Sequence, residues 1–298
     1  MDTKQFRAGY VAVMGRPNVG KSTLVNALLG QKVAAVSPRP QTTRRRQLGI
    51  LTTEHAQVIF VDTPGLHKPR HKLGESMNQE ARSALEHCDL VLFIVDASEA
   101  PKEEDQLLAH MIKDLRDLPQ VMLVLNKLDK VPSTTQDDVE NLFRVLLPSA
   151  AVMWVSAQRG DSLPELVQRI VNALPLGEPF FPEDQVTDLY EKEIAADLIR
   201  EACLKILREE IPHGIAVRVD DYKERGETGA YIAVTLIVER ETHKAIVIGQ
   251  NGAMLKRIGT AARQEIEAMS GRKVYLELRV KLRKNWRDDE KAVRQMYN

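Results

Sequence analysis

The chain of 298 residues is short of several features, and each shortage excludes a class of protein. No apolar run approaches the roughly 18 residues that a membrane-spanning helix needs, and the residues after Met1 do not begin a signal peptide. Cys88 and Cys203 are the only cysteines, and both lie in apolar, helix-like patterns. This placement favours buried free thiols over a disulfide or a metal site, so we expect a cytoplasmic protein.

Aromatic residues make up only 5% of the chain, so the stacking of bases on aromatic side chains is not the obvious mode of any nucleic-acid binding. The formal net charge is zero, but the charges are segregated. Residues 183–241 hold 8 basic and 15 acidic side chains, whereas residues 242–298 hold 13 basic and 6 acidic ones. The C-terminal positive charge predicts either a polyanionic partner or pairing with the acidic segment in the same domain.

The stretch Gly15–Ser22 reads G-x-x-x-x-G-K-S, between an apolar run at 10–14 and a helix-like run at 22–29. Strand, Gly-rich turn and helix together predict a phosphate-binding loop, because backbone N–H groups and the helix N-terminus direct positive partial charge at an anion. Lys21 would reach the outer phosphates, and the Ser22 hydroxyl would bind Mg²⁺. The residues expected around the phosphates are Gly15, Arg16, Pro17, Asn18, Val19, Gly20, Lys21, Ser22 and Thr23.

Short β-type runs alternate with helical patterns through residues 9–173. The strands are expected at 10–14, 47–52, 57–61, 89–96, 121–126 and 151–155, and the helices at 21–30, 75–87, 103–115, 136–147 and 164–173. This pattern predicts an α/β domain with a mixed, mostly parallel sheet and helices on both faces. Ligands of such sheets lie at the carboxyl ends of the strands.

Two further motifs point to the metal and the γ-phosphate. Residues 31–46 form a long irregular loop, in which Thr43 is the expected Mg²⁺ ligand and Thr42 the alternative. Asp62-Thr63-Pro64-Gly65 follows a strand, so that Asp62 would hold the Mg²⁺ shell and the Gly65 N–H would contact the γ-phosphate. We therefore expect Lys21, Thr43 and Gly65 to serve hydrolysis, and Ser22, Thr43 and Asp62 to hold the metal.

The motif Asn126-Lys127-Leu128-Asp129 selects the base. A carboxylate at Asp129 can accept hydrogen bonds from the N1–H and the exocyclic amine of guanine, whereas adenine would leave it unpaired. Lys127 would lie along the base plane, and a backbone N–H of Ser156-Ala157 would meet the guanine O6. A phosphate-loop kinase or ATPase has no use for this motif.

In order and spacing, these motifs resemble those of translation-factor-class GTPases. Leu66 stands where Ras-like proteins carry a water-orienting Gln, and in this the chain is similar to the bacterial Era/TrmE branch. The resemblance implies slow intrinsic hydrolysis. Some members of that branch hold K⁺ through an Asn of the phosphate loop, so Asn18 is either a K⁺ ligand or a simple turn former.

Residues 175–186 carry three prolines and a glycine and predict a linker, which Phe180-Phe181 would anchor to one domain. Beyond it, the order α-β-β-α-α-β is expected: a helix at 187–210 capped by Thr187, strands at 215–223 and 230–240, two helices around Gly249–Gly252, and a strand at 273–281. A short basic helix would end the chain. This α+β domain resembles a KH domain, in which the G-x-x-G turn packs against the backbone of unpaired RNA.

The KH resemblance implies a set of RNA-binding residues, with Ile246, Ile248 and Ile258 either lining the groove or belonging to the core. The set is Lys244, Ile246, Ile248, Gly249, Gln250, Asn251, Gly252, Lys256, Arg257, Lys281, Arg283 and Lys284. The alternatives for the whole turn are a structural helix connection and a site that docks protein.

A GTPase domain (1–174), a linker (175–186) and a KH domain (187–298) together resemble the Era family over nearly the whole chain. The resemblance implies a GTP-hydrolysing switch that binds the 3′ end of 16S ribosomal RNA and acts in assembly of the small (30S) subunit. It also implies Mg²⁺, K⁺ through Asn18, a monomer, and peripheral contact of the basic tail with the cytoplasmic face of the membrane.

Overall fold

The computed structural model describes residues 5–37, 39, 42–65, 69, 71–115, 117, 119–226 and 228–297, and divides the chain into two units. The N-terminal unit comprises Met1–Ala34, Thr43–Lys68 and Ser76–Asp188. The C-terminal unit comprises Ala35–Thr42, Pro69–Glu75 and Leu189–Asn298. Two segments of the predicted nucleotide-binding domain, 35–42 and 69–75, therefore group with C-terminal residues. No helix in the described part of the chain is long and apolar enough to cross a membrane.

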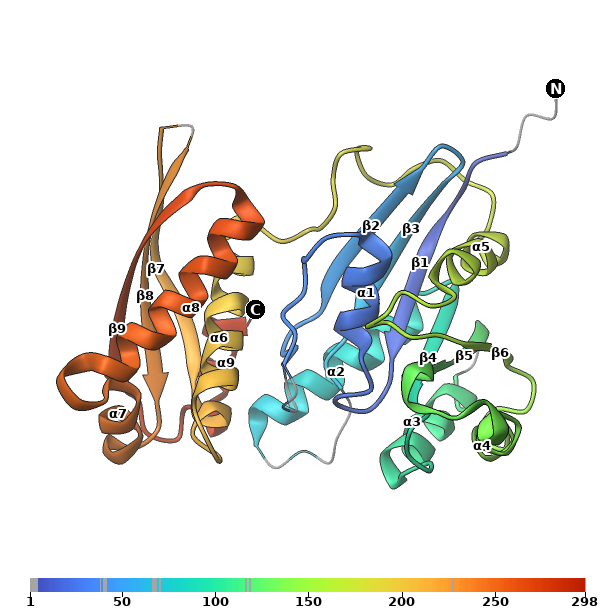
Figure 1. The fold of residues 1–298 in the computed structure, drawn as a ribbon, viewed down its shortest axis with the longest axis horizontal. Coiled ribbons are helices and arrows are strands. Elements are labelled where there is room, and N and C mark those ends of the chain that lie inside the picture. Colours follow the sequence, from blue (N-terminus) through green and yellow to red (C-terminus); the bar gives the residue numbers. More distant parts are fainter. Residues whose placement is uncertain are drawn as a thin grey trace. The chain divides into compact units, whose positions relative to one another are not determined.

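A mixed, mostly parallel sheet of strand order β2-β3-β1-β4-β5-β6 lies at the centre of the N-terminal unit (Figure 1). The strands are β1 (Arg7–Met14), β2 (Gln47–Thr53), β3 (Ala56–Asp62), β4 (Leu90–Asp96), β5 (Gln120–Asn126) and β6 (Ala151–Trp154). In this sheet β2 runs antiparallel to β3, and the other pairs are parallel. Every residue of β3 and β4 is buried, as expected of parallel strands covered on both faces.

Helices cover both faces of this sheet, as the sequence predicts. The helices are α1 (Lys21–Leu29), α2 (Lys72–Glu86), α3 (Glu103–Lys113), α4 (Gln136–Arg144) and α5 (Leu163–Ala173). Alternate residues of β1 point to opposite faces: Val11 and Val13 pack with α1 and α5, whereas Ala12 and Met14 pack with α2, α3 and α4. The carboxyl ends of the parallel strands thus meet at one edge of a covered sheet.

The predicted linker pairs closely with the edge of the N-terminal unit. The Gln57 side chain accepts hydrogen bonds from the N–H groups of Phe180 and Phe181 at 2.7 and 2.9 Å, which confirms the expected anchor. The Ile50 N–H donates to the Val186 carbonyl and the Leu48 N–H to Asp188 Oδ1, each at 2.9 Å. Because this pairing requires extended backbone, the predicted helix start at Thr187 is wrong, and the helix begins at Glu191.

The C-terminal unit follows the predicted order α-β-β-α-α-β. Its elements are α6 (Glu191–Ile206), β7 (Ala216–Arg225), β8 (Gly229–Val238), α7 (Glu241–Ile248), α8 (Ala253–Ser270), β9 (Lys273–Leu282) and α9 (Glu290–Tyr297). In the β7-β8-β9 sheet, β7 and β8 are antiparallel and β8 and β9 are parallel. The helices α6 and α8 cross one face of this sheet (Figure 1), and apolar residues of both helices share a core with the strands.

Candidate functional site

The turn between β1 and α1 is the predicted phosphate-binding loop, and its glycines stand where a side chain does not fit. Gly20 has a φ of 101°, in the left-handed region, and a Cβ there would overlap the Asn126 side chain. A Cβ at Gly15 would overlap the carbonyl oxygen of Ile94 in β4. The two glycines therefore let the loop lie directly against β4 and β5, so that its N–H groups are held by rigid strands.

Lys21 lies buried at the start of α1. Its Nζ donates to the carbonyl oxygens of Gly15 at 2.9 Å and Arg16 at 3.2 Å. Burial lowers the pKa of Lys21 to about 8, and the negative charge of Asp62 opposes this effect in part. The Lys21 ammonium group is thus held inside the phosphate-binding loop, where it loses hydration. A bound phosphate would stabilise its charged form.

Ser22, Thr43 and Asp62 come together as an all-oxygen cluster. Ser22 Oγ donates to Asp62 Oδ2 at 2.7 Å and lies 3.0 Å from Thr43 Oγ1. Asp62 is fully buried, burial raises its pKa, and its Oδ1 has no hydrogen-bond partner among the described residues. A carboxylate and two hydroxyls are the hard oxygen donors that Mg²⁺ prefers, so these residues fit the predicted metal site.

Thr42 and Thr43 differ in their surroundings. The Thr42 hydroxyl donates to the Arg39 carbonyl at 2.9 Å, and the Thr42 carbonyl accepts from Arg200 Nη2 of α6 at 2.6 Å. Nearby, Glu201 Oε2 accepts from the Val36 N–H at 3.0 Å, and Arg200 and Glu201 are each only 2% exposed. Helix α6 therefore holds the segment that immediately precedes the expected Mg²⁺ ligand.

The Asp62–Gly65 turn lies against the phosphate-binding loop. A Cβ at Gly65 would lie 2.8 Å from the Pro17 nitrogen, so the two backbones approach as closely as glycine allows. Thr63 Oγ1 donates to the Val13 carbonyl of β1 at 2.9 Å, which fixes the turn to the central strand, and Pro64 beside it is buried. Leu66, the residue that replaces the water-orienting Gln, lies outside the described residues.

The Asn126 side chain connects its own loop to the phosphate-binding loop and to the loop at Ser156-Ala157. Its Nδ2 donates to the Val19 carbonyl of the phosphate-binding loop at 2.8 Å, and its Oδ1 accepts from the Ala157 N–H at 3.0 Å. The residue is 2% exposed. Because both ends of the amide are used within the protein, Asn126 positions the loops of the site.

Asp129, the residue expected to bind the base, lies three residues after the end of β5. Ser156 Oγ donates to its Oδ1 at 2.6 Å, which leaves the lone pairs on Oδ2 for a ligand. The neighbouring Lys127 has a φ of 68°, and its Nζ forms an ion pair with the buried Asp96 at the end of β4. Burial opposes ionisation of Asp96, but the hydrogen bonds from Lys127 and Ser98 prevail, and its pKa is lowered.

An acidic cluster that the sequence interpretation did not include surrounds Arg16. Arg16 is 8% exposed, its Nη2 lies 2.7 Å from Glu99 Oε2, and its Nε lies 3.2 Å from Asp105 Oδ2. Asp96 Oδ2 lies 3.8 Å from the same guanidinium. The Arg16 side chain therefore anchors the phosphate-binding loop to β4 and α3. The sequence signal for this cluster is Asp96, an acidic residue at the end of the fully buried strand β4.

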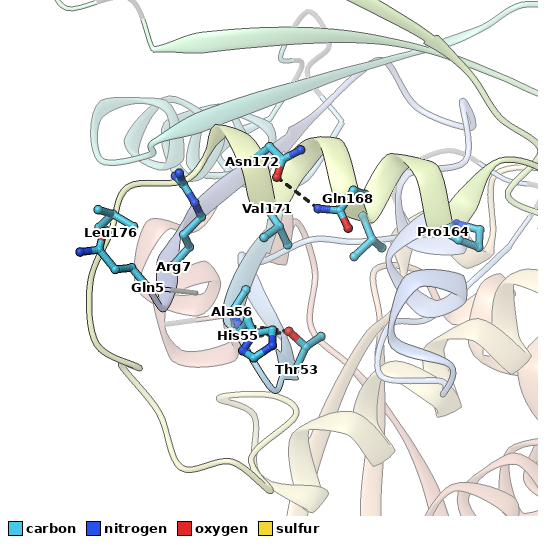
Figure 2. A pocket seen from close by; sticks show the side chains of 11 residues that line it. Gln5, Arg7, Thr53, His55, Ala56, Pro164, Gln168, Val171, Asn172 and Leu176 are labelled. Carbon is cyan, nitrogen blue, oxygen red and sulfur yellow. Dashed lines mark hydrogen bonds between the residues drawn. The ribbon is translucent and has the colours of Figure 1, made fainter. Parts of the chain in front are cut away.

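A cavity of 660 Å³ lies elsewhere in the N-terminal unit (Figure 2). It is lined by Gln5, Arg7, Thr53, His55, Ala56, Pro164, Val167, Gln168, Val171, Asn172 and Leu176. Its walls are the start of β1, the turn between β2 and β3 and the side of α5 that faces this turn, where Gln168 and Asn172 form a hydrogen bond of 3.1 Å. None of the predicted nucleotide-binding residues lines this cavity, because they lie at the carboxyl ends of the strands.

The predicted G-x-x-G turn joins α7 to α8. Gly249 has a φ of 72°, and a Cβ there would lie 2.7 Å from Met254 Cβ, so the turn closes tightly onto α8. Gly252 has a φ of 77° and no heavy atom within 4 Å of a Cβ built on it. Gln250 and Asn251 are exposed at the tip between them. The turn thus offers bare backbone beside the N-terminus of an 18-residue helix, an arrangement that suits a phosphate.

The other predicted RNA-binding residues lie in several places. Lys256 and Arg257 are exposed near the start of α8. On α7, Lys244 and Ile248 are half-buried and Ile246 is 46% exposed. Ile258 is fully buried, so it belongs to the core. Lys281 lies on the sheet face away from the helices, while Arg283 pairs with Asp289 at 2.6 Å and Lys284 is exposed beyond β9.

Two family models match this chain. Residues 10–127 match the family described as 50S ribosome-binding GTPase, and residues 210–287 match the KH domain. Among curated relatives, GTPase Era of Caldanaerobacter subterraneus subsp. tengcongensis is 46% identical over 292 residues, covering 98% of this chain and 97% of the relative. GTPase Era of Geobacter metallireducens is 42% identical over 297 residues, covering 99% of both chains.

Solved structures are similar over the same length. An Era structure in complex with MgGDPNP and nucleotides 1506–1542 of 16S ribosomal RNA has a TM-score of 0.93 and 42% identity, covering 98% of each chain. A variant of Aquifex aeolicus Era bound to GDP·AlF4⁻ has a TM-score of 0.92 and 42% identity, covering 98% of this chain and 99% of the other. The similarity therefore includes both units and not the nucleotide-binding part alone.

Proposed function

The chain belongs to the Era family of GTPases, and on that basis we propose that it is a GTP-hydrolysing switch whose KH domain binds the 3′ end of 16S ribosomal RNA during small-subunit assembly. The observation that carries the proposal is the coexistence of two sites in one chain. Asp129, held by Ser156 Oγ at 2.6 Å, fits the reading of guanine, and the exposed backbone of the Gly249–Gly252 turn fits an RNA phosphate. A similar structure holds both a GTP analogue and ribosomal RNA.

In GTP hydrolysis the chain's own residues would mainly position charge. Lys21 would give up its bonds to the Gly15 and Arg16 carbonyls and contact the phosphate oxygens. Ser22, Thr43 and Asp62 would hold Mg²⁺, which neutralises phosphate charge when bound. The Gly65 N–H would contact the γ-phosphate. Because Leu66 cannot orient water, we expect slow turnover of the isolated protein.

The switch would act through the segment 35–42. Arg200 of α6 holds the Thr42 carbonyl, and Thr43 follows directly in the chain. A ligand that draws Thr43 toward a metal and γ-phosphate would also act on the neighbouring Thr42 carbonyl, and so on its hydrogen bond with Arg200. Since binding equilibria are reciprocal, RNA and the GTP state then favour each other by the same factor.

We expect the affinity for an unpaired ribosomal 3′-end oligonucleotide to be about 5- to 150-fold higher with a non-hydrolysable GTP analogue than with GDP. Fluorescence anisotropy of the labelled oligonucleotide measures this ratio. Arg200→Gln should bring the ratio toward one. Arg208 is exposed and lies beyond the end of α6, so Arg208→Gln should leave the ratio unchanged. Equal RNA affinities in the two nucleotide states of the unsubstituted protein would contradict the switch.

K⁺ is a further proposed cofactor. Asn18 is exposed in the phosphate-binding loop with a φ of 66°, and its amide oxygen is a donor that an alkali cation accepts. Replacing K⁺ by Na⁺ should slow single-turnover GTP hydrolysis by on the order of 10-fold. Asn18→Ala should remove the difference between the two ions, whereas Asn18→Asp, which keeps an oxygen donor, should retain it. Ion-independent hydrolysis by the unsubstituted protein would assign Asn18 to turn formation alone.

A cytoplasmic location, a monomeric state and peripheral membrane contact of the basic C-terminal residues are proposed from the family resemblance. The described part of α9 carries both charge signs, with Arg294 paired to Glu290 at 2.7 Å. This pairing does not favour a lipid surface over RNA as the partner of the C-terminal residues.

A further inference from the structure

The face of the β7-β8-β9 sheet away from α6 and α8 is only partly covered. Ala216, Thr235 and Ile237 on this face are buried and α9 contacts β7, whereas the part of the face next to the β7–β8 turn is exposed. Leu276, Leu278 and Val280 of β9 pack into the core beneath the helices, and Leu278 lies directly against Gly259 of α8. Because side chains alternate along a strand, the residues between them face the other way. These are Lys273, Tyr275, Glu277, Arg279 and Lys281, and we call the surface that they share with β7 and β8 the open face.

Two tyrosines lie side by side on the open face. Tyr231 of β8 and Tyr275 of β9 are register partners, with ring centroids 5.8 Å apart and ring planes only 19° from parallel. Tyr275 is 64% exposed. Tyr231 is fixed because its hydroxyl donates to Glu277 Oε2 at 2.7 Å and the Arg225 guanidinium lies 5.1 Å from its ring centroid. Tyr231 therefore lies between Tyr275 on one side and the Arg225 guanidinium on the other, and the exposed ring of the pair is that of Tyr275.

Positive charge surrounds this aromatic pair. The open face carries the basic residues Arg218, Lys223, Arg225, Lys273, Arg279 and Lys281 and the acidic residues Asp220, Asp221 and Glu277. Each of these acidic groups has a basic partner: Asp220 pairs with Arg218, Asp221 with Lys223, and Glu277 with Arg279. Further positive charge comes from Arg225, Lys281 and Lys273, of which Lys273 also lies 4.0 Å from Glu267 Oε2 of α8. The side chain of Lys273, two residues from Tyr275 in β9, is 89% exposed.

We propose that the open face is a second RNA-binding surface, on which an unpaired base stacks against the exposed ring of Tyr275, supported from behind by Tyr231, while phosphates meet Arg225 and Lys273. Stacking on aromatic rings is independent of base identity, and flanking cations follow the backbone. A protein partner, including a second copy of this chain, would instead have to desolvate the charged residues that border the rings. The proposal rests on the proposed RNA-binding function and extends it beyond the Gly249–Gly252 turn, which alone contacts about four nucleotides.

The test uses the full chain with a GTP analogue and two labelled unpaired RNAs of ribosomal 3′-end sequence. One RNA is about four nucleotides long and fills only the turn, and the other is several times longer. We expect Tyr275→Ala to lower affinity for the long RNA by about 5- to 100-fold and to leave the short RNA within about 2-fold. Tyr275→Phe keeps the ring and should bind both RNAs normally. Photocrosslinking with 4-thiouridine in the long RNA should label the peptide that contains Tyr275.

Three outcomes would overturn the proposal. Equal affinity of Tyr275→Ala and the unsubstituted protein for the long RNA, with crosslinks only near Gly252, would confine RNA to the turn and leave the proposed function intact. Failure of the unsubstituted protein to bind either RNA would remove the proposed function itself. Loss of self-association in Tyr275→Ala, measured by sedimentation velocity and without a change in RNA affinity, would assign the open face to a second copy of the chain.

Discussion

Asp129→Asn is expected to transfer the nucleotide preference of this protein from guanine to xanthine. The carboxylate accepts hydrogen bonds from two guanine donors, whereas the asparagine amide accepts one and donates one, which matches the N1–H and the 2-carbonyl of xanthine. Asp129 is held by Ser156 Oγ at 2.6 Å, so its orientation is fixed before a base binds. A site that leaves buried polar groups unpaired rejects the wrong ligand by about 10⁴- to 10⁵-fold, and we expect GTP affinity to fall by at least about 10³-fold.

Displacement of a fluorescent guanine nucleotide by unlabelled GTP and XTP measures the exchange of preference. Asp129→Ala is the matched control, because it should lose GTP without gaining XTP. Ser156→Ala keeps the carboxylate but frees its orientation, so a smaller loss of GTP affinity with no gain of XTP is expected. RNA binding by the nucleotide-free protein should be the same in all three variants. If Asp129→Asn still prefers GTP, then Asp129 does not read the base.

The nucleotide site could be predicted from the sequence because its parts are local. Asp62 and Asn126 end strands and Ser156 lies two residues after one, and parallel strands have their carboxyl ends at one edge of the sheet. Residues that act through long-range contacts were harder to predict. The helix start at Thr187 was predicted wrongly because the signal for a cap is local, whereas the pairing of Asp188 with the Leu48 N–H of β2 is set by the tertiary fold.

The same limit applies to the C-terminal unit. The order of elements and the turn follow from patterning, but the stacking of Tyr231 on Tyr275 depends on the register between β8 and β9. The 5% aromatic content gave no reason to expect an aromatic surface, because composition does not show which residues become neighbours. The contact of Arg200 with Thr42 spans 158 residues and has no local sequence signal.

Gly252→Asp is expected to weaken RNA binding by between about 5- and 1000-fold. A negative charge about 4 Å from a phosphate costs about 1 kcal/mol in water and about 4 kcal/mol near a protein surface, which corresponds to this range. Gly252 has open space around its Cβ, and although its φ of 77° strains most side chains, Asp and Asn adopt the left-handed region more readily than other residues. Gly249→Asp would be a poorer test, since its Cβ would meet the Met254 backbone and disturb the fold.

Gly252→Asn separates charge from shape. Asn has nearly the same size as Asp and also tolerates the φ of 77°, so it should fold equally well and retain RNA binding within a few-fold. GTP binding should be unchanged in both variants, because Asp129 and Ser156 lie in the other unit. Electrophoretic mobility shift over a salt series measures the effect, and the Asp penalty should shrink as salt screens it. Equal RNA affinities for the Asp and Asn variants would show that phosphate does not approach this turn, and the turn would then be a structural connection between α7 and α8.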